Sequence, residues 1–186
     1  MNNYCVDLNL PMPLSDSISD IVGFLKQYDK GHFQIDKELV NNELKLLLDK
    51  CNLDISLIEV FHRQPLAVGN IHSDLDIVGD YSKLNWIYGG EGSIMKWYKI
   101  NKTYIKSETT HTTDINSYAL YYKDTEVDLI HLQTVGQPSL VQVGIPHRVV
   151  NGNAERFCVC VVFEDRDTKK RPTFQEALEL FKNYIK

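Results

Sequence analysis

The sequence predicts a mainly β protein with flanking helices, folded as a single domain over residues 1–186. Two observations lead to this fold class. From about Ile55 to Phe163 the chain consists of short β-branched and aromatic runs separated by Gly, Asn, Asp and Pro. On both sides of that region, apolar residues recur instead at the spacing of amphipathic helices. With 43% hydrophobic residues the chain can bury a sizeable core.

Two helices are expected in the N-terminal segment 15–51. The first is expected over Ser15 to Tyr28, where Asp16 or Ser17 can cap the N-terminus and apolar residues fall on one face. The second is expected over Asp36 to Cys51, again with one apolar side.

The C-terminal segment 172–186 is expected to form a third helix. Thr173 and Glu176 have the spacing of a capping box, in which each side chain satisfies a backbone N–H of the first turn. A broad apolar stripe follows. Because such stripes are usually core, we expect this helix to pack on the outside of the sheet.

The central segment 56–164 is expected to form the β core. The expected strands are 56–62, 66–72, 83–88, 93–100, 117–122, 125–132, 139–143 and 156–163. About eight short strands with turn signals between them suggest a closed sandwich or barrel, and the number fits a jelly roll. Residues 101–117 lack clear periodicity, which suggests either a lid or a plain surface connector.

Four residues in this β region suggest a metal site beside an anion site. His72 and Asp74 are two apart, so on a strand both side chains point to one face. His147 would complete a set of two imidazoles and one carboxylate, which holds Fe(II) with open positions. Arg156 heads an apolar strand, and an arginine that enters a core needs an anion.

Each of these residues also has a structural interpretation. His72 and Asp74 can be strand-end and turn residues, and Asp76 is a rival carboxylate. His147 can be an exposed turn histidine, and Arg156 can pair with an acidic side chain of the protein. Asn151-Gly152 predicts a tight hairpin that would bring Arg156 close to His147.

Three segments resemble the Fe(II)- and 2-oxoglutarate-dependent oxygenases: Ile71–Asp74, Gly144–Asn151 and Arg156 on its strand. The nearest branch is the aspartyl/asparaginyl-hydroxylase-like one and its small phage and bacterial relatives. The aspartyl hydroxylases of that branch lack the carboxylate ligand, whereas this chain has Asp74. The resemblance covers about residues 56–164 and implies a double-stranded β-helix of the cupin-like, jelly-roll type.

The resemblance also implies the cofactors and the site residues. Fe(II) would be held by His72, Asp74 and His147, and 2-oxoglutarate by Arg156 with help from Asn85 on a neighbouring strand. The activity would be a dioxygenase reaction, usually a hydroxylation, of a small molecule or a protein side chain. Two other functions stay open: a cupin-like metal enzyme without 2-oxoglutarate, and a non-enzymatic jelly-roll module.

Composition narrows the partners and the compartment. The net charge of −5 and the absence of a basic stripe argue against nucleic-acid binding. The start of the chain lacks the pattern of a signal peptide, and no apolar run is long enough to span a membrane. Cys158 and Cys160 are expected as small core residues on one face of a strand, and the cysteines show no disulfide pattern. We therefore expect a cytoplasmic protein.

Overall fold

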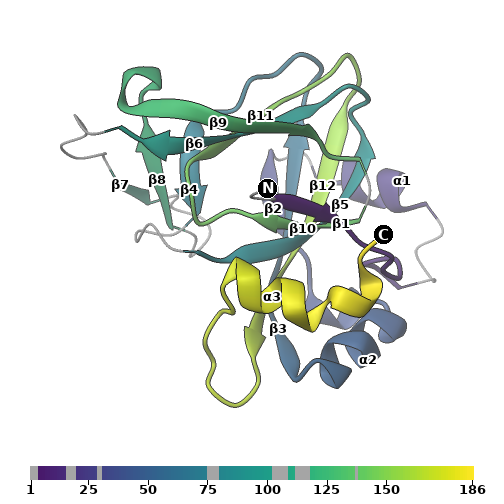
Figure 1. Ribbon diagram of the computed structural model, residues 1–186. Coiled ribbons are helices and arrows are strands. Elements are labelled where there is room, and N and C mark those ends of the chain that lie inside the picture. The colour runs from purple at the N-terminus through teal and green to yellow at the C-terminus, as the bar shows by residue number, and fades with distance from the viewer. Residues whose placement is uncertain are drawn as a thin grey trace.

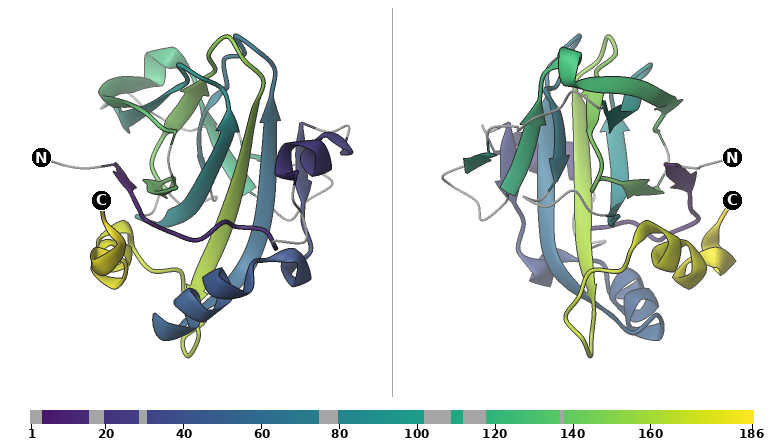
Figure 2. Two further views of the ribbon diagram at one scale, coloured as in Figure 1. Left: turned by 90° about the vertical axis from the view of Figure 1, so that its right-hand side faces the viewer. Right: turned by 60° about the vertical axis from the view of Figure 1, so that its left-hand side comes forward.

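A computed structural model describes residues 4–15, 20–28, 31–74, 80–101, 109–111, 118–136 and 138–186. These residues form two six-stranded antiparallel sheets that face each other as a β-sandwich (Figure 1, Figure 2). The first sheet has the strand order β1-β10-β5-β12-β3-β2, and the second has the order β7-β8-β4-β11-β6-β9. The prediction of a mainly β protein with flanking helices is confirmed.

The strands alternate between the two sheets from β3 to β6 and from β9 to β12. The first sheet comprises β1 (Cys5–Asp7), β2 (His32–Gln34), β3 (Leu53–Arg63), β5 (Ser82–Gly89), β10 (Ser139–Gln142) and β12 (Arg156–Asp165). The second sheet comprises β4 (Ile71–Asp74), β6 (Ile94–Ile100), β7 (Thr109–His111), β8 (Tyr118–Tyr122), β9 (Val127–Thr134) and β11 (His147–Val150).

The helices are shorter than predicted. They are α1 (Ile21–Lys26), α2 (Asn42–Lys50) and α3 (Phe174–Leu180), with short 3-10 turns at η1 (Lys37–Leu39), η2 (Asp124–Glu126) and η3 (Lys182–Tyr184). The capping box of Thr173 and Glu176 at the start of α3 is confirmed.

Both N-terminal helix predictions were too long. The first helix begins only after Asp20, whose side chain accepts from the N–H of Gly23, while 16–19 lie outside the described residues. The second is split, because Val40 is extended and forms a bridge with Leu14. A new cap, Asn41, then starts α2.

The strand expected over 66–72 is also wrong in its first half. Leu66 lies in a turn with a positive φ of 62°, and Val68 makes only an isolated bridge with Val150. The segments that form β1 and β2 were not predicted as strands. Of the expected lid or connector 101–117, Thr109–His111 pairs with β8 as β7, and the parts 102–108 and 112–117 lie outside the described residues.

The hairpin predicted at Asn151-Gly152 is wrong, because β11 and β12 belong to different sheets. The segment instead crosses the end of the sandwich. The Asn151 side chain accepts from Ser93 Oγ at 2.7 Å and donates to the carbonyl of Gln64 at 2.7 Å. A Cβ at Gly152 would lie 1.8 Å from the carbonyl oxygen of Glu91, so the crossing requires glycine here.

The first sheet has two different faces. Alternate residues of β12, namely Phe157, Val159 and Val161, belong to the main apolar cluster together with buried residues of all three α-helices. The residues between them face a pocket lined by both sheets. The helices therefore cover the outer face of the sheet, and the inner face of β12 is left for the pocket.

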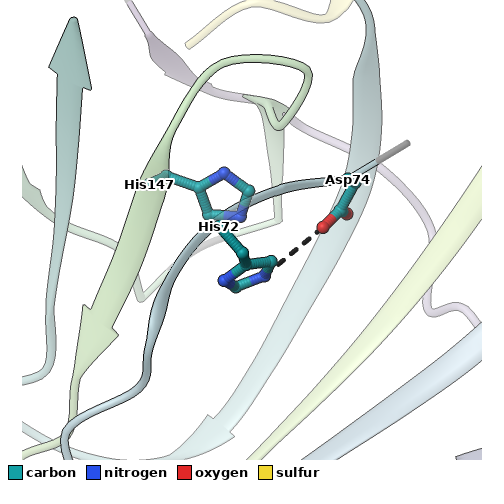
Figure 3. Close-up of side chains that lie close together, drawn as sticks. All are labelled: His72, Asp74 and His147. Atoms are coloured by element: carbon teal, nitrogen blue, oxygen red, sulfur yellow. Dashed lines mark ion pairs between the residues drawn. The ribbon is translucent and has the colours of Figure 1, made fainter. Parts of the chain in front are cut away.

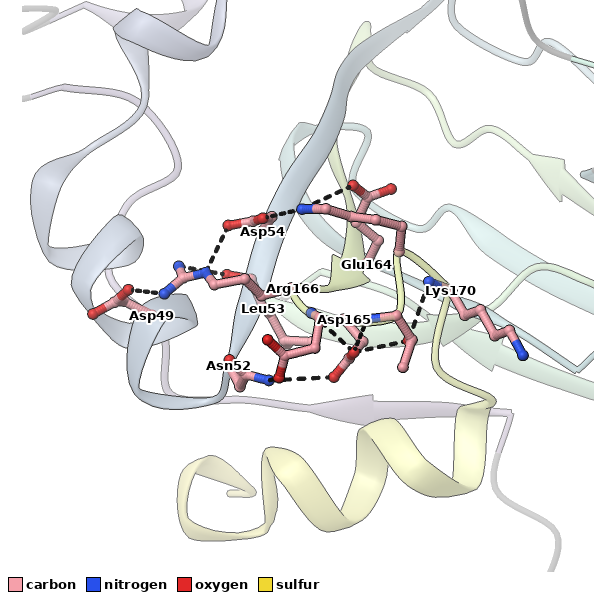
Figure 4. A network of polar contacts seen from close by, with 11 residues as sticks. Asp49, Asn52, Leu53, Asp54, Glu164, Asp165, Arg166 and Lys170 are labelled. Carbon is pink, nitrogen blue, oxygen red and sulfur yellow. Dashed lines mark hydrogen bonds and ion pairs between the residues drawn. The ribbon is translucent and has the colours of Figure 1, made fainter.

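Ion pairs at the surface join α2 to the loop that follows β12 (Figure 4). Arg166 contacts Asp49 on α2 and Asp54 on β3, and Lys169 Nζ lies 2.7 Å from a carboxylate oxygen of Asp54. Exposed pairs of this kind contribute about 0–1 kcal/mol each. Within the described part of the chain, none of the helices has the length and apolar character needed to cross a membrane.

Candidate metal centre and anion pocket

His72 and His147 face each other across two neighbouring strands. They are directly paired in the register of β4 and β11. Side chains of a directly opposed pair share one face of the sheet. The centroids of the two rings lie 4.5 Å apart, and Figure 3 shows both rings turned toward the carboxylate of Asp74.

The tautomer of both histidines suits a metal ligand. His72 Nδ1 lies 2.9 Å from the carbonyl oxygen of Asn70, and His147 Nδ1 lies 2.9 Å from that of Ile145. A carbonyl only accepts, so each Nδ1 carries the proton and donates. In the neutral ring each Nε2 then has a lone pair available for a metal, and the hydrogen bond from Nδ1 fixes the ring orientation.

Asp74 completes a cluster of three candidate ligands. Its Oδ1 lies 3.3 Å from Nε2 of His72, and the ligand atoms of the three residues all lie within 4.8 Å of one another. Burial, together with the neighbouring His72, lowers the pKa of His147 to about 4, so this ring is neutral at pH 7. Neutral imidazoles and a carboxylate form a set that can hold a divalent transition metal with open positions.

A buried lysine holds the other oxygen of Asp74. Lys83 Nζ lies 2.7 Å from Asp74 Oδ2 and 2.6 Å from Glu59 Oε2, and Glu59 Oε1 lies 3.2 Å from His32 Nε2. Burial alone would lower the pKa of Lys83, but the two carboxylates outweigh it and hold this pKa well above its usual value. Lys83 therefore stays charged and leaves Oδ1 as the oxygen that faces the histidines.

Two arginines stand further along the same pocket. Arg156 on β12 is paired in register with Arg63 on β3, and both line the pocket. Arg156 is buried, with 4% of its surface exposed, and its Nε has no hydrogen-bond partner. Burial and the neighbouring Arg156 lower the pKa of Arg63. Among the described residues, neither guanidinium has a carboxylate within 4.0 Å, so the pair lacks an anion from the protein.

The backbone beside Arg156 is shaped to admit it. Gly90 has a φ of +68°, and a Cβ at this position would lie 2.7 Å from Cβ of Arg156. Any larger residue here would therefore both strain the backbone and displace the arginine. The close approach of this loop lets the guanidinium enter the pocket at its rim.

Asn85 also has an unsatisfied polar atom in this pocket. It lies on β5 and is paired in register with Cys160. Its side chain is buried, and its Oδ1 has no hydrogen-bond partner. A buried amide oxygen without a donor carries a cost of about 1–3 kcal/mol unless another group satisfies it.

The structure thus brings all five predicted site residues into one pocket: His72, Asp74, His147, Asn85 and Arg156. The rival Asp76 lies outside the described residues. The prediction for Cys158 and Cys160 was incomplete, because both are buried but line the pocket.

Sequence reasoning missed Glu59 and Arg63. Glu59 stands between Ile58 and Val60 within the strand Leu53–Arg63, and this apolar setting is the signal that could have revealed it, whereas Arg63 at the end of the strand has no such signal. Comparison with known proteins adds no relative to this description, since no protein-family model and no curated protein matches the chain.

Proposed function

We propose that this protein is an Fe(II)- and 2-oxoglutarate-dependent oxygenase. The observation that carries the proposal is that one pocket contains a cluster of three candidate metal ligands and, further along, two arginines without a carboxylate partner among the described residues. A metal enzyme that does not use 2-oxoglutarate needs only the first half of this arrangement. A binding module without catalytic function needs neither half.

The strand order supports the double-stranded β-helix that this function implies. The central strands of the first sheet run β10-β5-β12-β3, and those of the second run β4-β11-β6-β9. In chain order, the eight strands from β3 to β12, leaving out the β7-β8 pair, mostly alternate between the sheets. A jelly roll distributes its eight strands between two sheets in this way.

The residues of the pocket have separate tasks in this proposal. Nε2 of His72, Nε2 of His147 and Oδ1 of Asp74 hold the metal, and Lys83 keeps Asp74 in place through its other oxygen. Fe(II), when bound, supplies the site at which dioxygen is activated. The keto-acid end of 2-oxoglutarate belongs at the metal.

The far carboxylate of 2-oxoglutarate belongs at Arg156, which can donate two parallel hydrogen bonds to it. Asn85 lies on β5 and lines this space, where its amide nitrogen would donate to the bound dianion. Met95, Val143 and Val149 contribute apolar wall that excludes water from this space. No residue is needed as a separate acid or base, because the cofactor carries the chemistry and the protein orients it. The substrate is a small molecule or a protein side chain.

Anaerobic titration with Fe(II), with and without 2-oxoglutarate, tests this function. The proposal expects a visible metal-to-ligand charge-transfer band only when both are present. Iron binding without such a band, and without any heat of 2-oxoglutarate binding, would favour the metal enzyme that does not use this cosubstrate. A lack of iron binding would favour the non-enzymatic module.

The three ligands can be tested singly. His72→Ala, Asp74→Ala and His147→Ala are each expected to lose most of the Fe(II) affinity while the far-ultraviolet circular dichroism is unchanged. The fold should be kept, because the main apolar cluster lies on the other face of the first sheet and Lys83 still has Glu59 as a partner in Asp74→Ala. Iron binding at the level of the unmodified chain in all three variants would contradict the assignment.

A further inference from the structure

Two thiols form part of the pocket wall beside Arg156. Cys158 and Cys160 alternate with Val159 on β12, so both side chains point inward. Their sulfur atoms lie 3.4 Å apart, and both are free thiols. Neither is used by the proposed oxygenase reaction.

The surroundings of the two thiols are not those of an inert core. Arg156 is two residues before Cys158 on the same face of the strand, and no carboxylate of the described residues competes for its guanidinium within 4.0 Å. The Cys160 thiol is placed to donate a hydrogen bond to Cys158. This hydrogen bond and the guanidinium outweigh the effect of burial and lower the pKa of Cys158 to about 7, whereas burial and Cys158 raise that of Cys160. Cys158 is therefore the thiol of the pair that ionises more readily.

We propose that Cys158 is a peroxide-reactive thiol, activated inside the pocket by Arg156 and resolved by Cys160. The reagent class is a hydroperoxide, with hydrogen peroxide as the simplest member. Such a molecule is small and uncharged, so it can enter a pocket in which cations predominate. A low-pKa thiolate next to a second thiol is the usual arrangement of a redox-reactive cysteine.

The reaction has two steps. The thiolate sulfur of Cys158 attacks one oxygen of hydrogen peroxide, the O–O bond breaks, and the released hydroxide takes up a proton as water. The product is a sulfenic acid on Cys158. The sulfur of Cys160 then attacks the sulfur of Cys158, the S–O bond breaks, and the oxygen leaves as a second water. Two thiols and one peroxide thus give one disulfide and two waters.

The second step should be slower than the first. Residues two apart on a strand have Cα atoms about 6.7 Å apart, at the upper end of the range of up to about 6.8 Å seen in disulfides. The sulfurs must also approach from 3.4 Å to bonding distance while β12 stays paired with β3 and β5 on both sides. The sulfenic acid should therefore persist long enough to be trapped.

Cys51 is the internal reference for the test. It is more exposed than Cys158, but burial raises its pKa, so exposure and electrostatics predict opposite orders of reaction. Cys5 is buried with a pKa of about 12 and should react last. Because all four thiols are in one molecule, a variant that unfolds would show itself by equal reaction of every cysteine.

The experiment treats the 186-residue chain, freed of metal by a chelator, with hydrogen peroxide and dimedone, a reagent that traps sulfenic acids. Peptide mass spectrometry follows each cysteine over time. Cys158 is expected to be modified at least about fivefold faster than Cys51, from its larger thiolate fraction offset by lower nucleophilicity. A dimedone adduct on Cys158 and a Cys158–Cys160 disulfide both count as this result. Oxidation of Cys51 first, or at an equal rate, would overturn the proposal.

Two variants test the proposed roles of the neighbours. Cys160→Ser keeps a hydrogen-bond donor but cannot form the disulfide, so Cys158 should still react and its sulfenic acid should accumulate. Arg156→Met removes the cation and should reduce the rate of Cys158 relative to Cys51 by several-fold. An unchanged ratio in Arg156→Met, or an unreactive Cys158 in Cys160→Ser, would show that this pocket does not activate the thiol.

Discussion

The two faces of β12 show how one strand serves both stability and chemistry. On the outer face Phe157, Val159 and Val161 are each at most 1% exposed and pack in the main apolar cluster. On the inner face Arg156 and Cys158 line a pocket with other polar and charged groups. Neighbouring residues thus lie in environments of opposite polarity.

The difference teaches that the inner face is not optimised for stability. A buried charge is costly unless it is paired, and apolar residues of similar volume in its place are often neutral or stabilising. The outer face contains no such unpaired charge among the described residues, whereas the inner face has an orphaned Nε on Arg156 and an orphaned amide oxygen on Asn85. Inner-face substitutions should therefore change binding, and outer-face substitutions should change stability.

Truncation on the outer face should have the largest effect on stability. Phe163 is 1% exposed and packs edge-on against Phe181, with ring centroids 5.7 Å apart. Phe163→Ala should lower the free energy of unfolding by about 3–5 kcal/mol, because it removes buried apolar area and leaves a cavity. Urea denaturation measures this. The matched control is Leu132→Ala on β9, a residue with 54% exposure, which should change stability by less than about 0.5 kcal/mol.

Removal of the buried Lys83 side chain should lower the free energy of unfolding by a similar amount, for an electrostatic reason. Lys83→Met leaves the carboxylates of Asp74 and Glu59 without their shared cation, a loss of about 3–5 kcal/mol for a broken buried pair. Adding Glu59→Gln to Lys83→Met should restore part of the lost stability, because only one buried carboxylate is then left without a cation. Lys169→Met, which breaks exposed ion pairs, is the control and should lower stability far less. Equal losses for the two lysines would contradict the account.

Acid should lower the stability of the folded protein through protonation of Glu59. Although burial alone would raise it, Lys83 and His32 lower the pKa of Glu59 to about 2. Because the folded pKa is below the unfolded value of about 4.3, this stabilisation is complete above pH 4.3 or so and is lost as the pH falls toward 2. Between pH 6 and pH 3 the loss should be about 2 kcal/mol. Glu59→Gln should lack this component of the pH dependence, and an unchanged pH profile in that variant would contradict the assignment.

The smallest expected effect comes from Arg156, whose removal should change the affinity for 2-oxoglutarate and leave metal binding unchanged. Arg156→Ala should weaken 2-oxoglutarate binding by about 30-fold or more, because a charge-assisted bidentate contact is lost. Metal affinity should be almost unchanged. Arg156→Lys should restore binding only in part, since an ammonium keeps the charge but not the fork. Isothermal titration with Mn(II) in place of iron measures each constant without turnover. Normal binding by Arg156→Ala would make Arg156 a structural residue.

The composition of the pocket could be predicted from sequence only where the information was local. A two-residue spacing on a strand fixes one face, so His72 and Asp74 were placed together from the sequence. The pairing of Lys83 with Glu59 depends on how β3, β12 and β5 align, and no local pattern contains that register. Arg63 was missed for the same reason.

The predictions of one N-terminal helix and of one hairpin were wrong because tertiary contacts determine the backbone conformation at both places. The periodicity of 36–51 suggested one helix, yet the bridge between Val40 and Leu14 holds Val40 extended and interrupts it. The Asn151-Gly152 pair suggested a hairpin, but the hydrogen bonds of the Asn151 side chain fix a crossing between the two sheets. A single sequence indicates which turns are favourable and does not indicate which sheet the next strand joins.

The central claim is that one pocket holds a metal and a dianion at the same time. The most direct test is the affinity of 2-oxoglutarate measured by isothermal titration with and without Mn(II), on the unmodified chain and on His147→Ala. The account predicts that Mn(II) tightens 2-oxoglutarate binding by at least about tenfold, that 2-oxoglutarate tightens Mn(II) binding by the same factor, and that His147→Ala abolishes both effects. Equal affinities with and without the metal would show that the two halves of the pocket do not act on one ligand.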